Sequence, residues 1–95
     1  MNIIEKDRQY LWHPYTQHKT ASTPIAIVKG KGALLWDENG KEYIDAIASW
    51  WVNPFGHSNT FVADAIYKQL TTLEHVLFGG FTHEPAVRVA EKLIP

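Results

Sequence analysis

The chain contains no cysteine, and this absence excludes both a disulfide framework and any thiolate metal site. It is compatible with a reducing compartment. The sequence also has no excess of charge of either sign, with 9 Lys and Arg against 10 Asp and Glu and a net charge of −1. The charges are scattered and form no run, which argues against nucleic acid or an anionic membrane as a partner.

Long hydrophobic runs are missing as well. No apolar stretch is long enough to span a bilayer, and residues 1–8 lack the apolar segment of a signal peptide. Internal repeats and low-complexity segments are also absent. We therefore expect a cytoplasmic protein with no membrane association. Its 95 residues leave room for one domain at most, with a modest core.

Motifs for metal, phosphate or nucleophilic chemistry are not found. Gly30-Lys31-Gly32 leads into no helix that could hold a phosphate, and Ser49 has no evident base and acid beside it. The lysines lie in polar contexts that would not depress an amine pKa for Schiff-base work. The five histidines match no metal-binding spacing: His13, His18, His57, His75 and His83. Composition and spacing alone predict neither a catalytic centre nor a metal site.

A compact β unit is predicted at about residues 24–46. Strands are expected over 24–29, which is rich in β-branched residues, and over 33–37 and 42–46. Gly30-Lys31-Gly32 marks the first turn, and Asn39-Gly40 is a strong hairpin signal for the second. Consecutive short strands joined in this way predict an antiparallel meander.

Helices are predicted on both sides of this unit in the sequence. A short one is expected over residues 3–10, and longer ones at about 60–73 and 83–94, where apolar residues recur at helical spacing. Ser58 or Asn59 would cap the second helix, and Thr82 the last, which tolerates Pro85 in its first turn. The fold class is therefore α+β, a small three-stranded antiparallel meander with flanking helices.

Trp50 and Trp51 stand side by side in a predicted loop at about residues 47–57. Adjacent side chains of a strand or a helix diverge, so at least one indole must face something other than the main core. The pair could form the wall of a ligand site or a subunit interface, or one indole could fill the core and the other cover its rim. Tyr15 is either a core residue or a ligand contact. Gly79 and Gly80, within an apolar loop, permit either a simple tight turn or close approach of a ligand or another chain.

Three motifs taken together are more specific. They are Trp12-His13-Pro14-Tyr15-Thr16, the segment from Asp45 to Trp51, and the run from His75 to Ala86 that contains Phe-Gly-Gly-Phe-Thr-His. In this order they resemble the start of the class III pyridoxal phosphate-dependent aminotransferases, over nearly all of the chain. The meander, the Asp after it and the Gly56-His57 loop are similar across the family. The Trp pair and the other two motifs resemble its biotin-biosynthesis branch.

The resemblance implies a fold-type I enzyme that binds pyridoxal 5'-phosphate and works as a homodimer with active sites at the subunit interface. It implies transfer of an amino group to 8-amino-7-oxononanoate, giving 7,8-diaminononanoate, with S-adenosylmethionine as the usual donor. On this basis Tyr15, Trp50 and Trp51 would line the substrate site, and Gly79 would reach that site from the partner subunit. Asn53-Pro54-Phe55, beside the Trp pair, departs from the family pattern and leaves the donor open.

The parts of the family that carry its chemistry have no counterpart here. The large cofactor-binding domain, the Schiff-base lysine and the residues that hold the cofactor ring are absent, so the sequence predicts no catalytic and no cofactor-binding residue in this chain. We therefore expect an N-terminal piece of such an enzyme, inactive alone. Two other hypotheses stay open: an autonomous binding module that uses Tyr15, Trp50 and Trp51 as an aromatic platform, and an assembly domain whose apolar loops form an interface.

Overall fold

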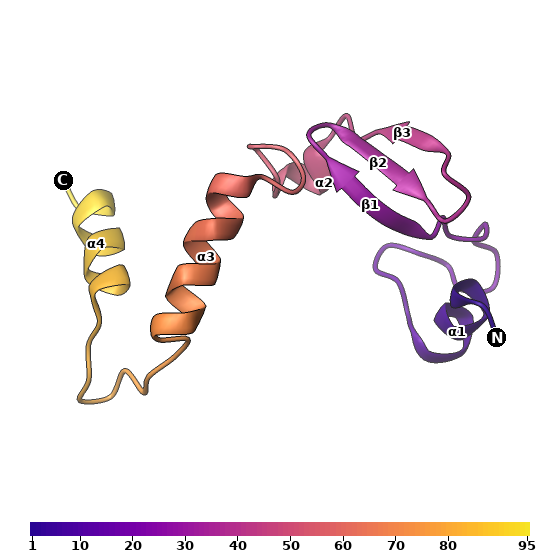
Figure 1. Cartoon of the computed structure of the whole chain (residues 1–95). Helices are drawn as coiled ribbons and strands as arrows, with labels where there is room; N and C mark the ends of the chain where they lie inside the picture. The colour runs from indigo at the N-terminus through magenta and orange to yellow at the C-terminus, as the bar shows by residue number, and fades with distance from the viewer. The chain divides into compact units, whose positions relative to one another are not determined.

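The computed structural model describes residues 1–95, which divide into two compact units, Met1–Asn59 and Thr60–Pro95. The first unit contains α1 (Ile3–Tyr10), β1 (Ile27–Lys31), β2 (Leu34–Asp37), β3 (Glu42–Ile44) and α2 (Ala48–Trp51) (Figure 1). The second contains α3 (Thr60–Thr72) and α4 (Glu84–Leu93). The predicted α+β class is confirmed. None of these helices is both long and apolar enough to cross a membrane.

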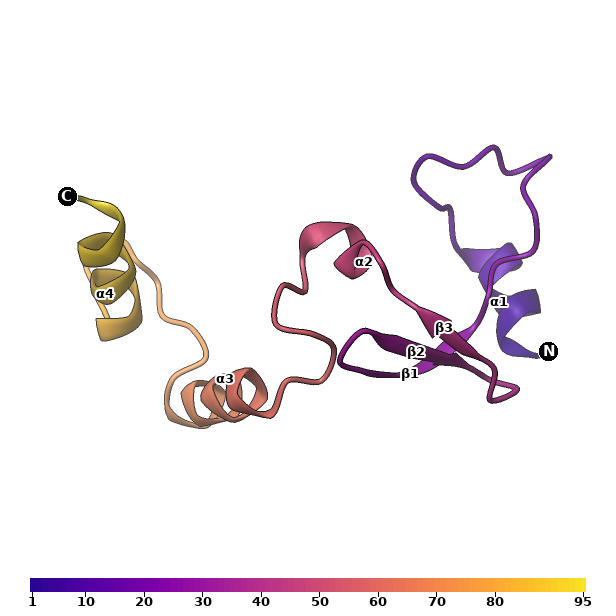
Figure 2. The ribbon, with the colours of Figure 1, turned by 90° about the horizontal axis from the view of Figure 1, so that it is seen from above.

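The three strands form an antiparallel sheet in the order β1-β2-β3, as the meander prediction required (Figure 2). In its register Trp36 lies opposite Lys29 on one side and Glu42 on the other. The first strand starts later and ends later than predicted, because it pairs with β2 up to Lys31 opposite Leu34. The turn therefore tightens to Gly32 and Ala33. The third strand ends two residues early, at Ile44.

The second hairpin closes at the predicted Asn39-Gly40 turn, where Gly40 has a φ of 81°. Asp37 organises this turn, since its carboxylate accepts hydrogen bonds from the Asn39 and Lys41 backbone N–H groups and from the Tyr43 hydroxyl, each at 2.9 Å. These bonds, that of Lys41 above all, hold the pKa of Asp37 below its usual range. The carboxylate of Asp37 thus fixes the Asn39-Gly40 turn that the sequence predicts.

The predicted helices are confirmed to within one or two residues at their ends. α1 is closed by a capping box in which Asn2 and Glu5 each accept a hydrogen bond from the other's backbone N–H. The prediction that Thr82 caps the last helix is wrong. His83 is the cap residue of α4, and its Nδ1 accepts a hydrogen bond from the Ala86 N–H at 3.3 Å. Thr is preferred over His as an N-cap residue. His83 nevertheless takes this role, because its extended backbone directs the ring at the Ala86 N–H.

Neither unit has a hydrophobic core of its own. No apolar side chain is buried in the chain, and the only buried residue is Asp37. Large apolar side chains are exposed on every helix, for example Ile3, Trp51, Ile66 and Val87. Sheets and amphipathic helices are stabilised by burying one face against another layer. The exposed apolar faces of these elements therefore need another surface to cover them.

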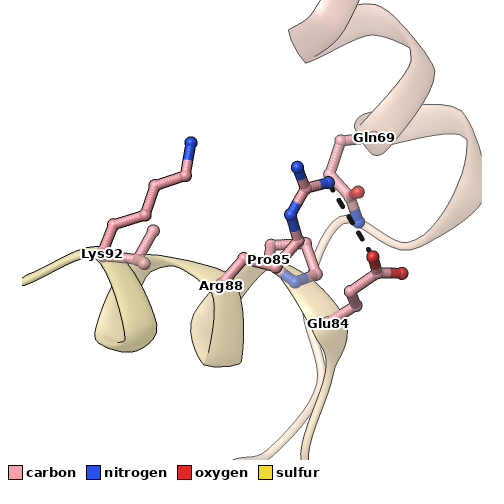
Figure 3. A pocket seen from close by; sticks show the side chains of 6 residues that line it. Gln69, Glu84, Pro85, Arg88 and Lys92 are labelled. Carbon is pink, nitrogen blue, oxygen red and sulfur yellow. Dashed lines mark ion pairs between the residues drawn. The ribbon is translucent and has the colours of Figure 1, made fainter.

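The second unit contains a hollow of about 360 Å³ between its two helices. Figure 3 shows Gln69 of α3 on one side and residues of α4 on the other, with an ion pair of 3.8 Å between Arg88 Nη1 and Glu84 Oε1. Both partners of this pair are well exposed, so it contributes little to stability. None of the residues predicted to form a site lines this hollow.

Candidate functional site

The loop that carries the Trp pair is fastened to the sheet at both ends. At its start, the Asp45 N–H donates to the Ala33 carbonyl at 2.8 Å. At its end, His57 and Gly32 exchange two backbone hydrogen bonds of 2.8 and 3.0 Å, and the Ser58 hydroxyl donates to the Gly30 carbonyl at 2.7 Å. The turn between β1 and β2 therefore positions the whole loop.

Glycines allow this close approach. Gly56 has a φ of 85°, and a Cβ on it would lie 3.0 Å from the Gly32 Cα. A Cβ on Gly30 would lie 2.9 Å from the Cβ of His57. Side chains at these positions would push the loop away from the β1–β2 turn.

Gly56→Ala is expected to destabilise the protein by more than Gly40→Ala. Both substitutions place a Cβ on a left-handed residue, which costs about 1 kcal/mol. Only Gly56→Ala also creates a backbone clash, because nothing lies within 4 Å of a Cβ at Gly40. Urea unfolding of the two variants, in the protein as the host cell makes it, measures the difference. Equal losses of unfolding free energy would contradict the tight contact at Gly56.

α2 is a single turn of left-handed helix. Its four residues, Ala48 to Trp51, have φ angles of 48°, 49°, 71° and 70°, and the Trp51 N–H donates to the Ile47 carbonyl at 2.8 Å. Left-handed geometry costs an L-residue roughly 1–2 kcal/mol, and none of these four is glycine or asparagine. The sequence predicted an ordinary loop here. It offers no local signal for this turn, so the conformation must be imposed by its surroundings.

Asp45, Ser49 and His57 form a compact hydrogen-bonded cluster next to the turn. Asp45 Oδ2 accepts from the Ser49 hydroxyl and from His57 Nε2, both at 2.6 Å, and Asp45 Oδ1 accepts from the Ser49 N–H at 2.9 Å. The Asp45 and His57 side chains are only 7% and 15% exposed. Hydrogen bonds from Ser49, and then the one from His57, lower the pKa of Asp45 to about 2.

This cluster corrects the sequence-based view of Ser49, which does have an acid and an imidazole beside it. The arrangement is still not a nucleophilic triad. Ser49 donates its proton to Asp45 rather than to His57, and a carboxylate with a pKa of about 2 is too weak a base to activate the hydroxyl. The sequence gives a weak signal for the cluster, because Ser49 follows Asp45 by four residues and Gly56-His57 ends the loop. Only the fold shows that all three side chains meet.

The pKa of Asp45 predicts a loss of stability in acid. Its folded pKa of about 2 lies below the ordinary value of 3.8, so the carboxylate stabilises the fold fully above pH 3.8, and this contribution disappears as the pH falls toward 2. Asp45→Asn is expected to flatten the pH dependence of the unfolding free energy in this window. Urea unfolding of the wild type and of Asp45→Asn at several pH values, in the protein as the host cell makes it, measures this dependence. Parallel curves would show that Asp45 does not carry the effect.

The aromatic residues predicted to line a site lie together. The Tyr15 ring stands edge-on to Trp50 at a centroid distance of 5.0 Å, and the rings of Trp50 and Trp51 are 6.4 Å apart. Tyr15, Trp50 and Trp51 are 89%, 52% and 78% exposed, so neither indole fills a core of this chain. We call these three residues the aromatic cluster. It offers apolar ring faces and one phenol hydroxyl to a ligand or to another surface.

Gly79 belongs to the second unit, and the structure does not place it relative to the aromatic cluster. Its neighbour Gly80 has a φ of 92° and needs to be glycine for conformational reasons. No such reason applies to Gly79, because an added Cβ would meet only Leu77 Cγ, at 3.9 Å. The chain itself therefore gives no explanation for a glycine at position 79.

The described residues do not fit a pyridoxal phosphate site by themselves. All seven lysines are exposed, and none has the buried setting that a Schiff-base lysine requires. No group of three or more His, Asp or Glu side chains lies close enough together to hold a metal ion.

The family model described as class III aminotransferase matches residues 15–95. The chain belongs to the class III aminotransferase family.

The sequence is also similar to individual named enzymes. The chain is 51% identical, over 84 residues, to the adenosylmethionine-8-amino-7-oxononanoate aminotransferase of Synechococcus elongatus, covering 88% of this chain and 20% of that protein. It is 45% identical over 94 residues to the enzyme of the same name from Staphylococcus aureus, covering 97% and 21%.

The chain is similar to solved structures of aminotransferases as well. The chain matches the adenosylmethionine-8-amino-7-oxononanoate aminotransferase of Methanocaldococcus jannaschii with a TM-score of 0.86 and 38% identity, covering 95% of this chain and 21% of that one. An omega transaminase from Pseudomonas jessenii in complex with PMP matches with a TM-score of 0.90 and 38% identity, covering 99% and 21%. The chain thus spans about a fifth of the length of the relatives it matches.

Proposed function

We propose that this chain is the N-terminal part of a pyridoxal phosphate-dependent aminotransferase that converts 8-amino-7-oxononanoate to 7,8-diaminononanoate in biotin biosynthesis. S-adenosylmethionine is the proposed amino donor, and the cytoplasm is the proposed location. The relatives named for this activity, at 51% and 45% identity over most of the chain, support the proposal. The chain by itself is proposed to be inactive, because its residues do not fit the cofactor.

The observation that carries the proposal is the aromatic cluster, in which Tyr15 stands against the Trp pair of the fastened loop. 8-Amino-7-oxononanoate is a long apolar chain that ends in a carboxylate, so it needs apolar walls and a few polar groups to orient it. Trp50 and Trp51 offer such walls, and Tyr15 places a hydroxyl beside them. We assign these three residues to the substrate site of the complete enzyme.

Gly79 is assigned to the same site, as a contribution from the partner subunit of a homodimer. The open space around it supports this role, because a residue without a side chain there would let a backbone from one subunit approach a ligand on the other. The exposed apolar residues of both units would be buried in such a subunit interface.

The test uses the protein as the host cell makes it, whose size is first measured by blotting an extract with antibody to these residues. The purified protein is then supplied with pyridoxal phosphate, 8-amino-7-oxononanoate and either S-adenosylmethionine or single amino acids. Formation of 7,8-diaminononanoate with S-adenosylmethionine supports both parts of the proposal. Formation of this product only with an amino acid would show that the amino acid, and not S-adenosylmethionine, is the donor. A native band near 10.8 kDa and no product would overturn the proposal.

The exposure of the aromatic cluster also fits a second function, an autonomous binding module for a sugar or a peptide. This alternative requires the short chain to be a stable folded monomer, which the proposed aminotransferase does not require.

A further inference from the structure

We propose that Asp45 is a positioning residue for substrate specificity, which holds the left-handed turn Ala48–Trp51 and thereby sets the orientation of both indoles. The effect on substrate rests on the proposed function, whereas the effect on the indoles does not.

The turn needs an external support. Four consecutive residues without glycine lie in the left-handed region, where an L-side chain is unfavourable. The bond from the Trp51 N–H to the Ile47 carbonyl and the longer one, 3.2 Å, from the Asn53 N–H to the Ala48 carbonyl close the turn, but equivalent bonds would also form in a right-handed turn. The handedness must therefore be selected by contacts outside the turn.

Asp45 provides those contacts. Its two carboxylate oxygens bind the backbone N–H and the hydroxyl of Ser49, the residue immediately before Trp50. Holding both groups of Ser49 on one carboxylate restricts its backbone and its side chain together. The third bond, from His57, links the carboxylate to the sheet, because the His57 backbone is paired with Gly32. A continuous path of hydrogen bonds thus runs from the sheet to the Trp pair.

Asp45 acts through the turn rather than on a ligand. Its carboxylate already accepts three hydrogen bonds, two from Ser49 and one from His57, and its side chain is 7% exposed. It lines a hollow of about 200 Å³, which is smaller than the roughly 300–1,000 Å³ of ordinary ligand pockets. The indoles that it orients, by contrast, are open to solvent.

The first test is Asp45→Asn in the protein as the host cell makes it. The near-ultraviolet circular dichroism difference between wild type and Trp50→Phe defines the signal of the indole pair. Asp45→Asn turns one acceptor oxygen into a donor that faces Ser49 and His57, so this signal is expected to be lost. The KM for 8-amino-7-oxononanoate should rise about tenfold, with cofactor absorbance unchanged.

Asp37→Asn is the matched control. Asp37 is also a largely buried carboxylate that accepts three hydrogen bonds, but it serves the β2–β3 hairpin. This variant should lower the unfolding temperature and leave both the indole signal and the KM near their wild-type values. If Asp37→Asn and Asp45→Asn change the signal alike, the loss reflects general destabilisation, and the proposal is overturned.

Rescue provides the sharpest outcome. Ala48→Gly relieves left-handed strain without touching the Asp45 bonds, so adding it to Asp45→Asn is expected to restore part of the indole signal and of the KM. If Asp45→Asn does not fold, Ser49→Ala replaces it and removes only the hydroxyl bond. An unchanged signal and KM in the carboxylate or hydroxyl variant would reject the proposal. A lost signal in a protein that does not use 8-amino-7-oxononanoate would support the positioning role and reject the proposed function.

Discussion

Trp50→Ala in the complete aminotransferase is expected to reduce kcat/KM for 8-amino-7-oxononanoate about 30-fold. Removing an indole from an apolar wall forfeits the burial of a large ring, which is worth roughly 2 kcal/mol. It also removes the edge-on partner of Tyr15 and the neighbour of Trp51. Steady-state kinetics with the donor held saturating measure the change.

The loss should be specific to substrate. The absorbance spectrum of the bound cofactor and the half-reaction with the amino donor are monitored alongside, and the cofactor spectrum is expected to stay nearly as in wild type. Tyr15→Phe is the matched variant, because it keeps the ring against Trp50 and removes only the hydroxyl. It should weaken use of 8-amino-7-oxononanoate by a smaller factor. Wild-type kinetics in both variants would remove these residues from the substrate site.

The isolated chain of 95 residues is expected to show no cooperative thermal unfolding and to self-associate. No apolar side chain is buried in it, and large apolar residues are exposed on every helix, for example Phe61 of α3, and in the loops, for example Trp12 and Phe55. Cooperative unfolding requires a packed core that is lost all at once, and exposed apolar patches drive association. Circular dichroism melting and sedimentation velocity over a range of concentrations measure the two properties.

A soluble monomer with a sharp transition would contradict this expectation and favour the binding-module hypothesis. The control is a charged substitution on the apolar stripe of α4, Val87→Lys, which should reduce self-association if that stripe is one of the contact surfaces. In the complete enzyme the same substitution should lower stability, because the stripe would then be covered.

The site was predictable in part. Tyr15, Trp50 and Trp51 were singled out by residue type and by resemblance, and the fold does bring them within ring-contact distance. Their role in binding substrate stays a prediction, as does that of Gly79. The Asp45 cluster was missed, because Asp45 and His57 are twelve positions apart and meet only where the loop returns to the β1–β2 turn.

The sequence by itself determined the elements whose causes are local. The β-branched run at residues 24–29 and the Asn39-Gly40 turn predict the meander, and apolar residues at helical spacing, with Pro85 in a first turn, predict the helices, because propensities and turn signals act over a few residues. Only the tertiary structure decided the left-handed turn at Ala48–Trp51. The turn runs against the preferences of its own residues and is selected by hydrogen bonds from distant ones, which no local pattern encodes.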